Sequence, residues 1–199
     1  MPLLKQTARS FAILLWAMGI VVGITVAFAY QYRPAESAIA PERWPATSSC
    51  MFASDCATLV MFLHPHCVCS RASLHELAAL LARWPGRFNA QLIFINPTAA
   101  LSNGTCTELW NSAAKISGVT LRVDDQGTEQ RHFRARVSGE VFVYAPSGSL
   151  LYHGGITAGR GHVGDNPGRE ALESLLLQDQ PTACVRPVFG CELSSCRAN

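Results

Sequence analysis

The amino-acid sequence predicts an α/β three-layer sandwich, a central mixed sheet flanked by helices, preceded by an N-terminal transmembrane helix. Short apolar runs typical of buried strands alternate with amphipathic segments typical of helices, in the order β-α-β-α-β-α-β-β-α. Such alternation favours a parallel sheet, and the late strand pair around Pro146-Ser147-Gly148 indicates an antiparallel hairpin at its edge. A run of twenty residues without a charge, Phe11 to Tyr30, precedes all of these elements.

Length and composition narrow the functional classes. The chain has 199 residues, of which 49% are hydrophobic and 15% charged, and its formal net charge is +2. One compact domain with an appendage fits this length, and the apolar content excludes a disordered chain. The near-neutral charge leaves no electrostatic footprint for nucleic acid, so no nucleic-acid partner is expected. Eight cysteines are more than an average cytosolic enzyme carries, which points to an oxidising compartment.

The N-terminal segment, residues 1–32, is expected to be a cytoplasmic stub followed by a membrane anchor. Roughly 20 apolar residues in a helix span a bilayer, and Phe11–Tyr30 has that length. Lys5 and Arg9 precede this run, so the positive-inside rule places the N-terminus in the cytoplasm and the rest of the chain outside. Ala27-Phe28-Ala29 resembles a signal-peptide cleavage site, but the apolar run is longer than a usual signal core. We therefore expect an uncleaved single-pass anchor.

A linker and a folded domain are expected after the anchor. Residues 33–56 contain prolines and small polar residues and are expected to form the linker, and residues 57–180 the domain. Its first strand is expected at residues 58–63, a continuous apolar run, and its first helix at 73–84, where apolar residues recur at helical spacing. Apolar runs, a capping box and turn residues predict the later elements: a strand at 91–95, a helix from the capping box at 105–108, a strand at 119–123, a short helix at 128–135, and hairpin strands at 141–144 and 150–152.

The C-terminal part combines a glycine-rich loop, a last helix and a cysteine-containing tail. Asn166 as N-cap and Pro167 at the first helical position predict where the last helix begins. The tail, residues 181–199, has no periodicity and contains three cysteines, Cys184, Cys191 and Cys196. A stapling disulfide, a resolving thiol for Cys67 and a cap over the site are three hypotheses for these cysteines, and spacing alone does not decide among them.

Two further polar features are interpreted as local structure. Glu76 closes a capping box with Ser73 and is expected to have no catalytic role. The loop Gly154–Asn166, which contains Arg160, His162 and Asp165, is expected to turn the chain, the alternative being an anion site before a helix N-terminus.

The residues that carry chemistry follow the first predicted strand, in the segment His64-Pro65-His66-Cys67-Val68-Cys69-Ser70. Sites in open α/β sheets lie at the carboxyl ends of strands. A cysteine there also faces the positive end of the following helix, which favours thiolate over thiol. Two thiols one residue apart close only a small, strained disulfide ring, and strained disulfides are labile. Cys67 and Cys69 are therefore interpreted as a redox-active or metal-binding pair, the alternative being structural bridges to Cys50, Cys56 or Cys106.

Three features match a known family: a strand that ends near a cysteine, the strand and acidic turn at Val119–Gly127, and the hairpin at Val141–Tyr152. With them, residues 57–178 resemble thioredoxin-fold proteins, most closely the membrane-anchored, exported TlpA/ResA-type redoxins. Three shorter segments are similar to a small bacterial redoxin group labelled RedB: His64–Ser70, Gly154–Thr157 and Arg160–Asn166. The resemblance implies a thioredoxin-like fold, a domain on the periplasmic side of a bacterial membrane, and protein thiols or disulfides as substrates.

Two departures from the family pattern bear on the chemistry. The family's Cys-x-x-Cys motif aligns its first cysteine with Cys67 and its second with Ser70. The family's cis-proline, which shapes the peptide-binding edge and is thought to keep metals off the thiolates, aligns with Gly139. The absence of that proline favours the metal-binding alternative.

The main hypothesis is thiol–disulfide exchange without a cofactor. Cys67 is the expected nucleophile and Cys69 the resolving thiol, with His66 tuning the thiolate and Ser70 donating a hydrogen bond to it. The alternative is a copper or zinc carrier or sensor with ligands His64, His66, Cys67 and Cys69. A peroxidase-like redoxin is a third hypothesis, although the peroxiredoxin Pro-x-x-x-Thr-x-x-Cys run is absent from the sequence.

Overall fold

The computed structural model describes residues 2–95, 107–178 and 182–193. The chain divides into two units, Met1–Arg33 and Pro34–Asn199. The first unit contains α1 (Pro2–Gln31), a single helix of 30 residues. Within it, Arg9–Gln31 is long and apolar enough to cross a membrane, and none of its most apolar window is buried in the protein. Length and composition therefore qualify this segment as a candidate membrane span.

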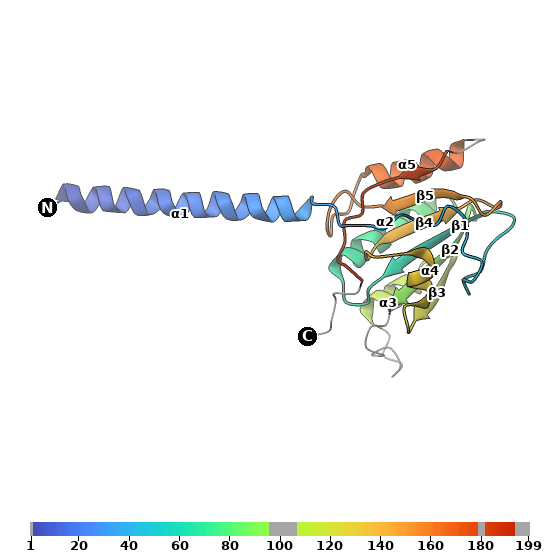
Figure 1. The fold of residues 1–199 in the computed structure, drawn as a ribbon. Helices are drawn as coiled ribbons and strands as arrows, with labels where there is room; N and C mark the ends of the chain where they lie inside the picture. Colours follow the sequence, from blue (N-terminus) through green and yellow to red (C-terminus); the bar gives the residue numbers. More distant parts are fainter. Residues whose placement is uncertain (1, 96–106, 179–181, 194–199) are drawn as a thin grey trace. The chain divides into compact units, whose positions relative to one another are not determined.

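The second unit is built on one six-stranded mixed sheet (Figure 1). Its strands are β1 (Ala57–Leu63), β2 (Phe88–Ile95), β3 (Val119–Asp124), β4 (Glu140–Tyr144), β5 (Leu150–Gly155) and β6 (Cys184–Val185). They lie in the order β3-β2-β1-β4-β5-β6. β1, β2 and β3 are parallel, whereas β4 runs antiparallel to β1 and β5. The predicted parallel core with an antiparallel hairpin is confirmed, and β6, which pairs with β5, is a sixth strand that the sequence did not predict.

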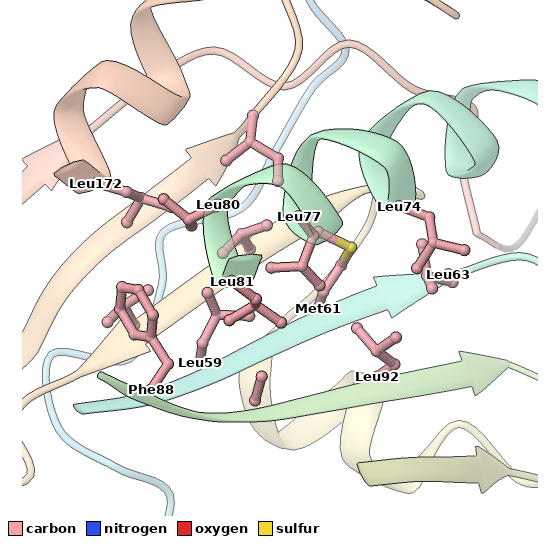
Figure 2. Close-up of a cluster of buried hydrophobic side chains, with 14 of the residues drawn as sticks. Leu59, Met61, Leu63, Leu74, Leu77, Leu80, Leu81, Phe88, Leu92 and Leu172 are labelled. Atoms are coloured by element: carbon pink, nitrogen blue, oxygen red, sulfur yellow. The ribbon is translucent and has the colours of Figure 1, made fainter. Parts of the chain in front are cut away.

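Helices cover both faces of this sheet and make three layers (Figure 1). The helices are α2 (Val68–Arg83), α3 (Glu108–Ala113), α4 (Thr128–Phe133) and α5 (Pro167–Leu177). Alternate residues of β1 enter two separate cores, Leu59 and Met61 with α2, α3 and α5, and Val60 and Phe62 with α4. Figure 2 shows Leu74, Leu77 and Leu81 of α2 beside β1, and Leu80 beside Leu172 of α5. Burial on both faces explains why β1 is a continuous apolar run, and the predicted sandwich is confirmed.

Helix α5 begins where the sequence predicts. The Asn166 side chain accepts a hydrogen bond from the Arg169 backbone N–H at 2.8 Å, and Pro167 stands in the first turn. Helix α2 begins at Val68, five residues before the predicted start, because Cys67 rather than Ser73 is its N-cap residue. Most of the predicted capping box at residues 105–108 lies outside the described residues, and Thr107 caps α3.

Residues 34–56 pack on the domain, whereas the sequence predicts a linker there. Ala40 and Cys50 are buried in the same core as α4. The Trp44 ring meets the rings of Phe133 and Tyr144 edge-on at centroid distances of 5.2 and 5.4 Å. The composition of this segment, rich in proline and small polar residues, does not predict its packing, because only Ala40, Trp44 and Cys50 contact the core.

Glu129 joins residues 48–49 to α4, the helix in which it lies. Its carboxylate accepts hydrogen bonds from the Ser48 hydroxyl at 2.6 Å and from the Ser49 N–H and hydroxyl at 2.8 Å each. Burial opposes its ionisation, but the bonds from Ser48 and Ser49 outweigh burial and hold the pKa of Glu129 below its ordinary value of 4.5. A depressed carboxyl pKa stabilises the fold above the unfolded pKa, and this stability is lost as the pH falls through the folded pKa.

We therefore expect Glu129→Gln to lower the free energy of unfolding at pH 7 by roughly 1–3 kcal/mol, since hydrogen bonds to a charged group are lost. The difference from the wild type should shrink as the pH falls below 4.5. Chemical denaturation of the full-length protein in detergent, between pH 7 and pH 3, measures both quantities. The exposed Glu42 is the control, and a Glu129→Gln effect that does not change with pH would contradict the prediction.

Candidate active site: a cluster of three thiols

Cys67 stands at the junction of β1 and α2. It is the N-cap residue of α2, with φ −89° and ψ 125°, and its backbone N–H donates to the His64 carbonyl oxygen at 3.1 Å. Cys69 lies in the first turn of the same helix. Both side chains are only 7% exposed and carry free thiols. The junction therefore places two sulfur atoms at the positive end of a long helix, where negative charge is favoured.

A third thiol joins this pair from the C-terminal tail. The Sγ atoms of Cys67, Cys69 and Cys191 all lie within 4.8 Å of one another. Cys191 is half-buried, whereas Cys67 and Cys69 are buried. Cys184 lies in β6, and Cys106 and Cys196 lie outside the described residues. The spacing of the tail cysteines does not predict which of them lies beside Cys67 and Cys69, because that depends on how the tail packs on the domain.

Cys67 and Cys69 differ in acidity. A hydrogen bond from Cys69 lowers the pKa of Cys67 well below its ordinary value, against the effect of burial, and the backbone N–H of Ser70 and the thiol of Cys191 lower it further. The same contact with Cys67 raises the pKa of Cys69, and burial and the charges on Cys67 and Cys191 raise it further. The shifts favour ionisation of Cys67 and protonation of Cys69.

The other predicted residues of the loop lie differently from what the sequence predicts. His66 is exposed, and its backbone N–H donates to Nδ1 of the buried His64 at 3.2 Å. Neither imidazole belongs to the group of potential ligand atoms around Cys67. The Ser70 hydroxyl donates to the His64 carbonyl oxygen at 3.1 Å and contacts the Ser138 hydroxyl. It is the Ser70 backbone N–H, and not the hydroxyl, that helps to lower the pKa of Cys67.

The turn before β4, which contains Ser138 and Gly139, is hydrogen-bonded to the end of β1 and the start of the Cys67 loop. The His64 backbone N–H donates to the Ser138 hydroxyl at 3.0 Å, and the Gly139 N–H donates to the Phe62 carbonyl oxygen at 2.8 Å. Gly139 has φ +88°, and a Cβ there would collide with the Ser73 hydroxyl of α2. The described residues contain no cis peptide bond. A left-handed glycine thus lies in the turn, at the position where the resemblance to redoxins predicts the replacement of a cis-proline.

Glu140 holds this turn in place and was not singled out from the sequence. Its carboxylate is fully buried and accepts hydrogen bonds from the backbone N–H groups of Arg136 and Val137 at 2.8 and 3.0 Å. Nε2 of His153, on β5, lies 2.7 Å from the other carboxylate oxygen. A glutamate beside a glycine at the start of a strand gives no local signal of such a network.

Glu76 has a wider role than the local capping box that the sequence predicts. It is buried in α2, accepts a hydrogen bond from the Gly164 backbone N–H at 2.7 Å and pairs with the Arg169 guanidinium of α5. This anchors the glycine-rich loop beside the site, where Gly161 faces Val68. Val68 itself is 75% exposed.

Comparisons with known proteins agree with the topology. The fold is thioredoxin-like. An uncharacterized conserved protein from Geobacillus kaustophilus shares 17% identity at a TM-score of 0.59, over 81% of this chain and 92% of that chain. A hypothetical protein from Sinorhizobium meliloti shares 18% identity at a TM-score of 0.54, over 82% of this chain and 93% of that chain. A secreted disulfide oxidoreductase from Mycobacterium tuberculosis shares 12% identity at a TM-score of 0.42, over 61% and 80% of the two chains. No protein-family model and no curated protein matches the sequence.

Proposed function

We propose that this chain is a membrane-anchored, extracytoplasmic redoxin that exchanges thiols and disulfides with protein substrates through Cys67 and Cys69. The observation that carries the proposal is the pair of neighbouring thiols at the start of α2, with Cys67 at the N-cap and Cys69 in the first turn. The lowered pKa of Cys67 and the raised pKa of Cys69 support it. The segment Arg9–Gln31 supports the anchor, and Lys5 and Arg9 at its start support the orientation. The motifs shared with TlpA/ResA-type and RedB redoxins support the same chemistry and a bacterial periplasmic location.

The reaction follows from the acidities of the two thiols. The Cys67 thiolate attacks one sulfur of a substrate disulfide, which breaks that bond, forms a mixed disulfide and releases the other substrate sulfur as a thiolate. Cys69 then gives up its proton to solvent or to that thiolate, attacks the Cys67 sulfur and releases the second substrate thiol. Two electrons pass from the protein to the substrate, and the reverse sequence oxidises a substrate dithiol.

The surroundings of Cys67 suit a polypeptide substrate. Cys67 belongs to neither of the two hydrophobic clusters formed by the described residues, although it is buried. Val68, directly beside it, presents an exposed apolar side chain. An apolar contact next to a reactive sulfur favours a protein partner over a small polar thiol.

The double variant Cys69→Ser/Cys191→Ser tests the proposal, because it leaves Cys67 as the remaining thiol of the cluster. The full-length variant in detergent, mixed with a peptide that carries a single disulfide, is expected to accumulate a mixed disulfide at Cys67. Mass spectrometry after acid quenching and alkylation identifies the modified residue.

Two further variants in that double-variant background control the experiment. Adding Cys67→Ser should remove the adduct, whereas adding Cys56→Ser should leave its yield unchanged, because the pKa of Cys56 is raised by burial and by Asp55. If no adduct forms at Cys67, or if the adduct survives Cys67→Ser, thiol exchange is not the function of this site.

A copper(I) carrier or sensor is the second candidate function, favoured by the three sulfur atoms within 4.8 Å of one another. Three soft thiolates suit Cu(I), whereas structural zinc requires a fourth ligand. Among the described residues, no histidine or carboxylate joins the three sulfurs. Cys67, Cys69 and Cys191 are therefore the residues that would hold the ion, in place of the predicted set with His64 and His66.

Metal analysis tests this second candidate. Full-length protein purified without oxygen is expected to contain about one copper per chain if it carries Cu(I), and the Cys67→Ser/Cys69→Ser variant should lose it. Cys50→Ser is the matched control, since Cys50 is equally buried and lies outside the cluster. Copper content that does not depend on Cys67 and Cys69 would refute the copper function.

A further inference from the structure

The C-terminal tail is attached to the domain on both sides of Cys191. The Ser138 backbone N–H donates to the Cys191 carbonyl oxygen at 2.8 Å, and the Leu193 N–H donates to the Arg136 carbonyl oxygen at 2.8 Å. Between them, Glu192 forms an antiparallel bridge with Val137. The tail therefore pairs as a short strand with the turn that also supports the Cys67 loop.

Apolar and charged side chains fix the tail further. Val188 and Leu193, before and after Cys191, are each 1% exposed. The Arg160 guanidinium, from the glycine-rich loop, donates to the Gly190 carbonyl oxygen. Gly190 lies so close to the turn that an added Cβ would overlap the Ser138 carbonyl oxygen and come within 2.8 Å of Val137. The position next to Cys191 thus has no room for any side chain.

The restraints on the two possible partners of Cys67 differ. Cys67 and Cys69 both belong to the start of α2, so the helix dictates how their sulfurs approach, and the ring between them is small. Cys191 lies on an extended segment that has no helical restraint, and its sulfur is within 4.8 Å of Cys67. A disulfide between Cys67 and Cys191 closes a large ring, free of the restraint that one helix turn puts on the Cys67–Cys69 bond.

We propose that Cys191 is the long-term disulfide partner of Cys67, so that the redox-active disulfide of the oxidised protein joins α2 to the C-terminal tail. This inference rests on the proposed thiol–disulfide exchange and names a second resolving residue for it. The Cys191 thiol gives up its proton to solvent and attacks the Cys67 sulfur of the Cys67–Cys69 disulfide. The Cys67–Cys191 bond forms, the Cys67–Cys69 bond breaks, and Cys69 leaves as a thiolate that takes up a proton from solvent. Internal exchange needs no further oxidant, because one disulfide replaces another.

The tail is docked beside Cys67 while the three cysteines are free thiols, and a Cys67–Cys191 bond would lock it there in the oxidised protein. Cys67 is buried with Cys191 against it, so a partner sulfur can reach Cys67 only after the Cys191 side chain moves. A reductant must first open the Cys67–Cys191 bond. The strained Cys67–Cys69 bond is the short-lived form that passes its oxidation to the tail.

Disulfide mapping tests the inference. Reduced full-length protein in detergent is oxidised with one equivalent of a peptide disulfide, quenched with acid, alkylated, digested and analysed by mass spectrometry. In the wild type, the Cys67–Cys191 link is expected to exceed the Cys67–Cys69 link by at least about tenfold. In Cys191→Ser, only the Cys67–Cys69 link should form among these three positions. Cys184→Ser, the matched change in the same tail, should not alter the ratio found in the wild type.

Two further variants retain all three cysteines but change how the tail docks. They distinguish the effect of the tail's position from the effect of losing a thiol. Gly190→Ala pushes the tail off the turn, and Arg160→Ala removes its guanidinium contact. Both are expected to shift the ratio toward Cys67–Cys69 by about tenfold, and Arg160→Lys should restore part of it. Unfolding curves of the same samples check that the domain remains folded.

The outcomes distinguish this inference from the proposed function. If the wild type forms only Cys67–Cys69, Cys191 is not the partner and thiol exchange through Cys67 and Cys69 stands. If Gly190→Ala and Arg160→Ala leave the ratio unchanged in folded protein, the docking of the tail is not what selects Cys191, and that part of the inference is wrong. If no disulfide forms at Cys67 in any variant, the proposed function fails as well.

Discussion

Replacing Cys67 with serine is expected to slow disulfide reduction by the full-length protein by a factor on the order of 10³ or more, since the nucleophile itself is lost. Cys69, the Ser70 backbone N–H and Cys191 lower the pKa of Cys67, against the effect of burial, and so favour its thiolate form. A serine hydroxyl in the same place stays protonated and does not attack sulfur. Stopped-flow measurement with a disulfide-bonded peptide gives the rate.

Cys50 provides a control that is matched in burial. Both thiols are 7% exposed, but burial raises the pKa of Cys50 to about 11. Cys50→Ser should therefore keep the rate of disulfide reduction within about twofold of the wild-type rate, since sites that share no partners act independently. Retention of more than a tenth of the activity in Cys67→Ser would show that another group performs the reaction.

The pH dependence of alkylation checks the same assignment. A thiol whose pKa is lowered is already ionised at neutral pH, so the rate of Cys67 alkylation by iodoacetamide should be nearly flat between pH 6 and pH 8. An ordinary thiol, with a pKa near 9.0, rises about tenfold per pH unit over that range. A tenfold rise at Cys67 would place its pKa above neutrality and remove the basis of the mechanism.

Replacing Glu140 with alanine is expected to lower the free energy of unfolding by about 3–5 kcal/mol, the typical cost of breaking a buried ion pair or network. The change leaves the buried N–H groups of Arg136 and Val137 without their acceptor and His153 without its carboxylate partner. Denaturant unfolding of the full-length protein in detergent, followed by near-ultraviolet circular dichroism, measures the loss.

Glu140→Gln separates charge from hydrogen bonding in this network. Its amide oxygen still accepts from Arg136 or Val137, so it should cost clearly less than Glu140→Ala. The alanine variant should also reduce the Cys67–Cys191 link, because Arg136 to Ser138 is the strip on which the tail pairs. A cost below about 1 kcal/mol for Glu140→Ala would mean that the turn is held by other contacts.

Much of the fold follows from local signals in the sequence. The apolar run that becomes β1, the recurring apolar residues of α2 and the Asn166-Pro167 start of α5 are each encoded within a few neighbouring residues. The loop with Cys67 and Cys69 is predicted as the candidate site for the same reason. Two cysteines between a buried strand and a helix can be recognised from neighbouring residues alone. Composition was misleading for residues 34–56, where a few buried side chains are hidden among prolines and serines.

Strand and helix periodicity, the apolar N-terminal run and the Cys67–Cys69 pair can all be read in one dimension, since each depends on the spacing of adjacent residues. The third sulfur could not be read in that way. Cys191 reaches the site because Gly190 has no side chain, Ser138 offers a free N–H to the tail and Glu140 holds the turn from beneath. Such contacts join residues far apart in the chain, and only packing and hydrogen bonding in three dimensions determine which of the tail cysteines meets Cys67.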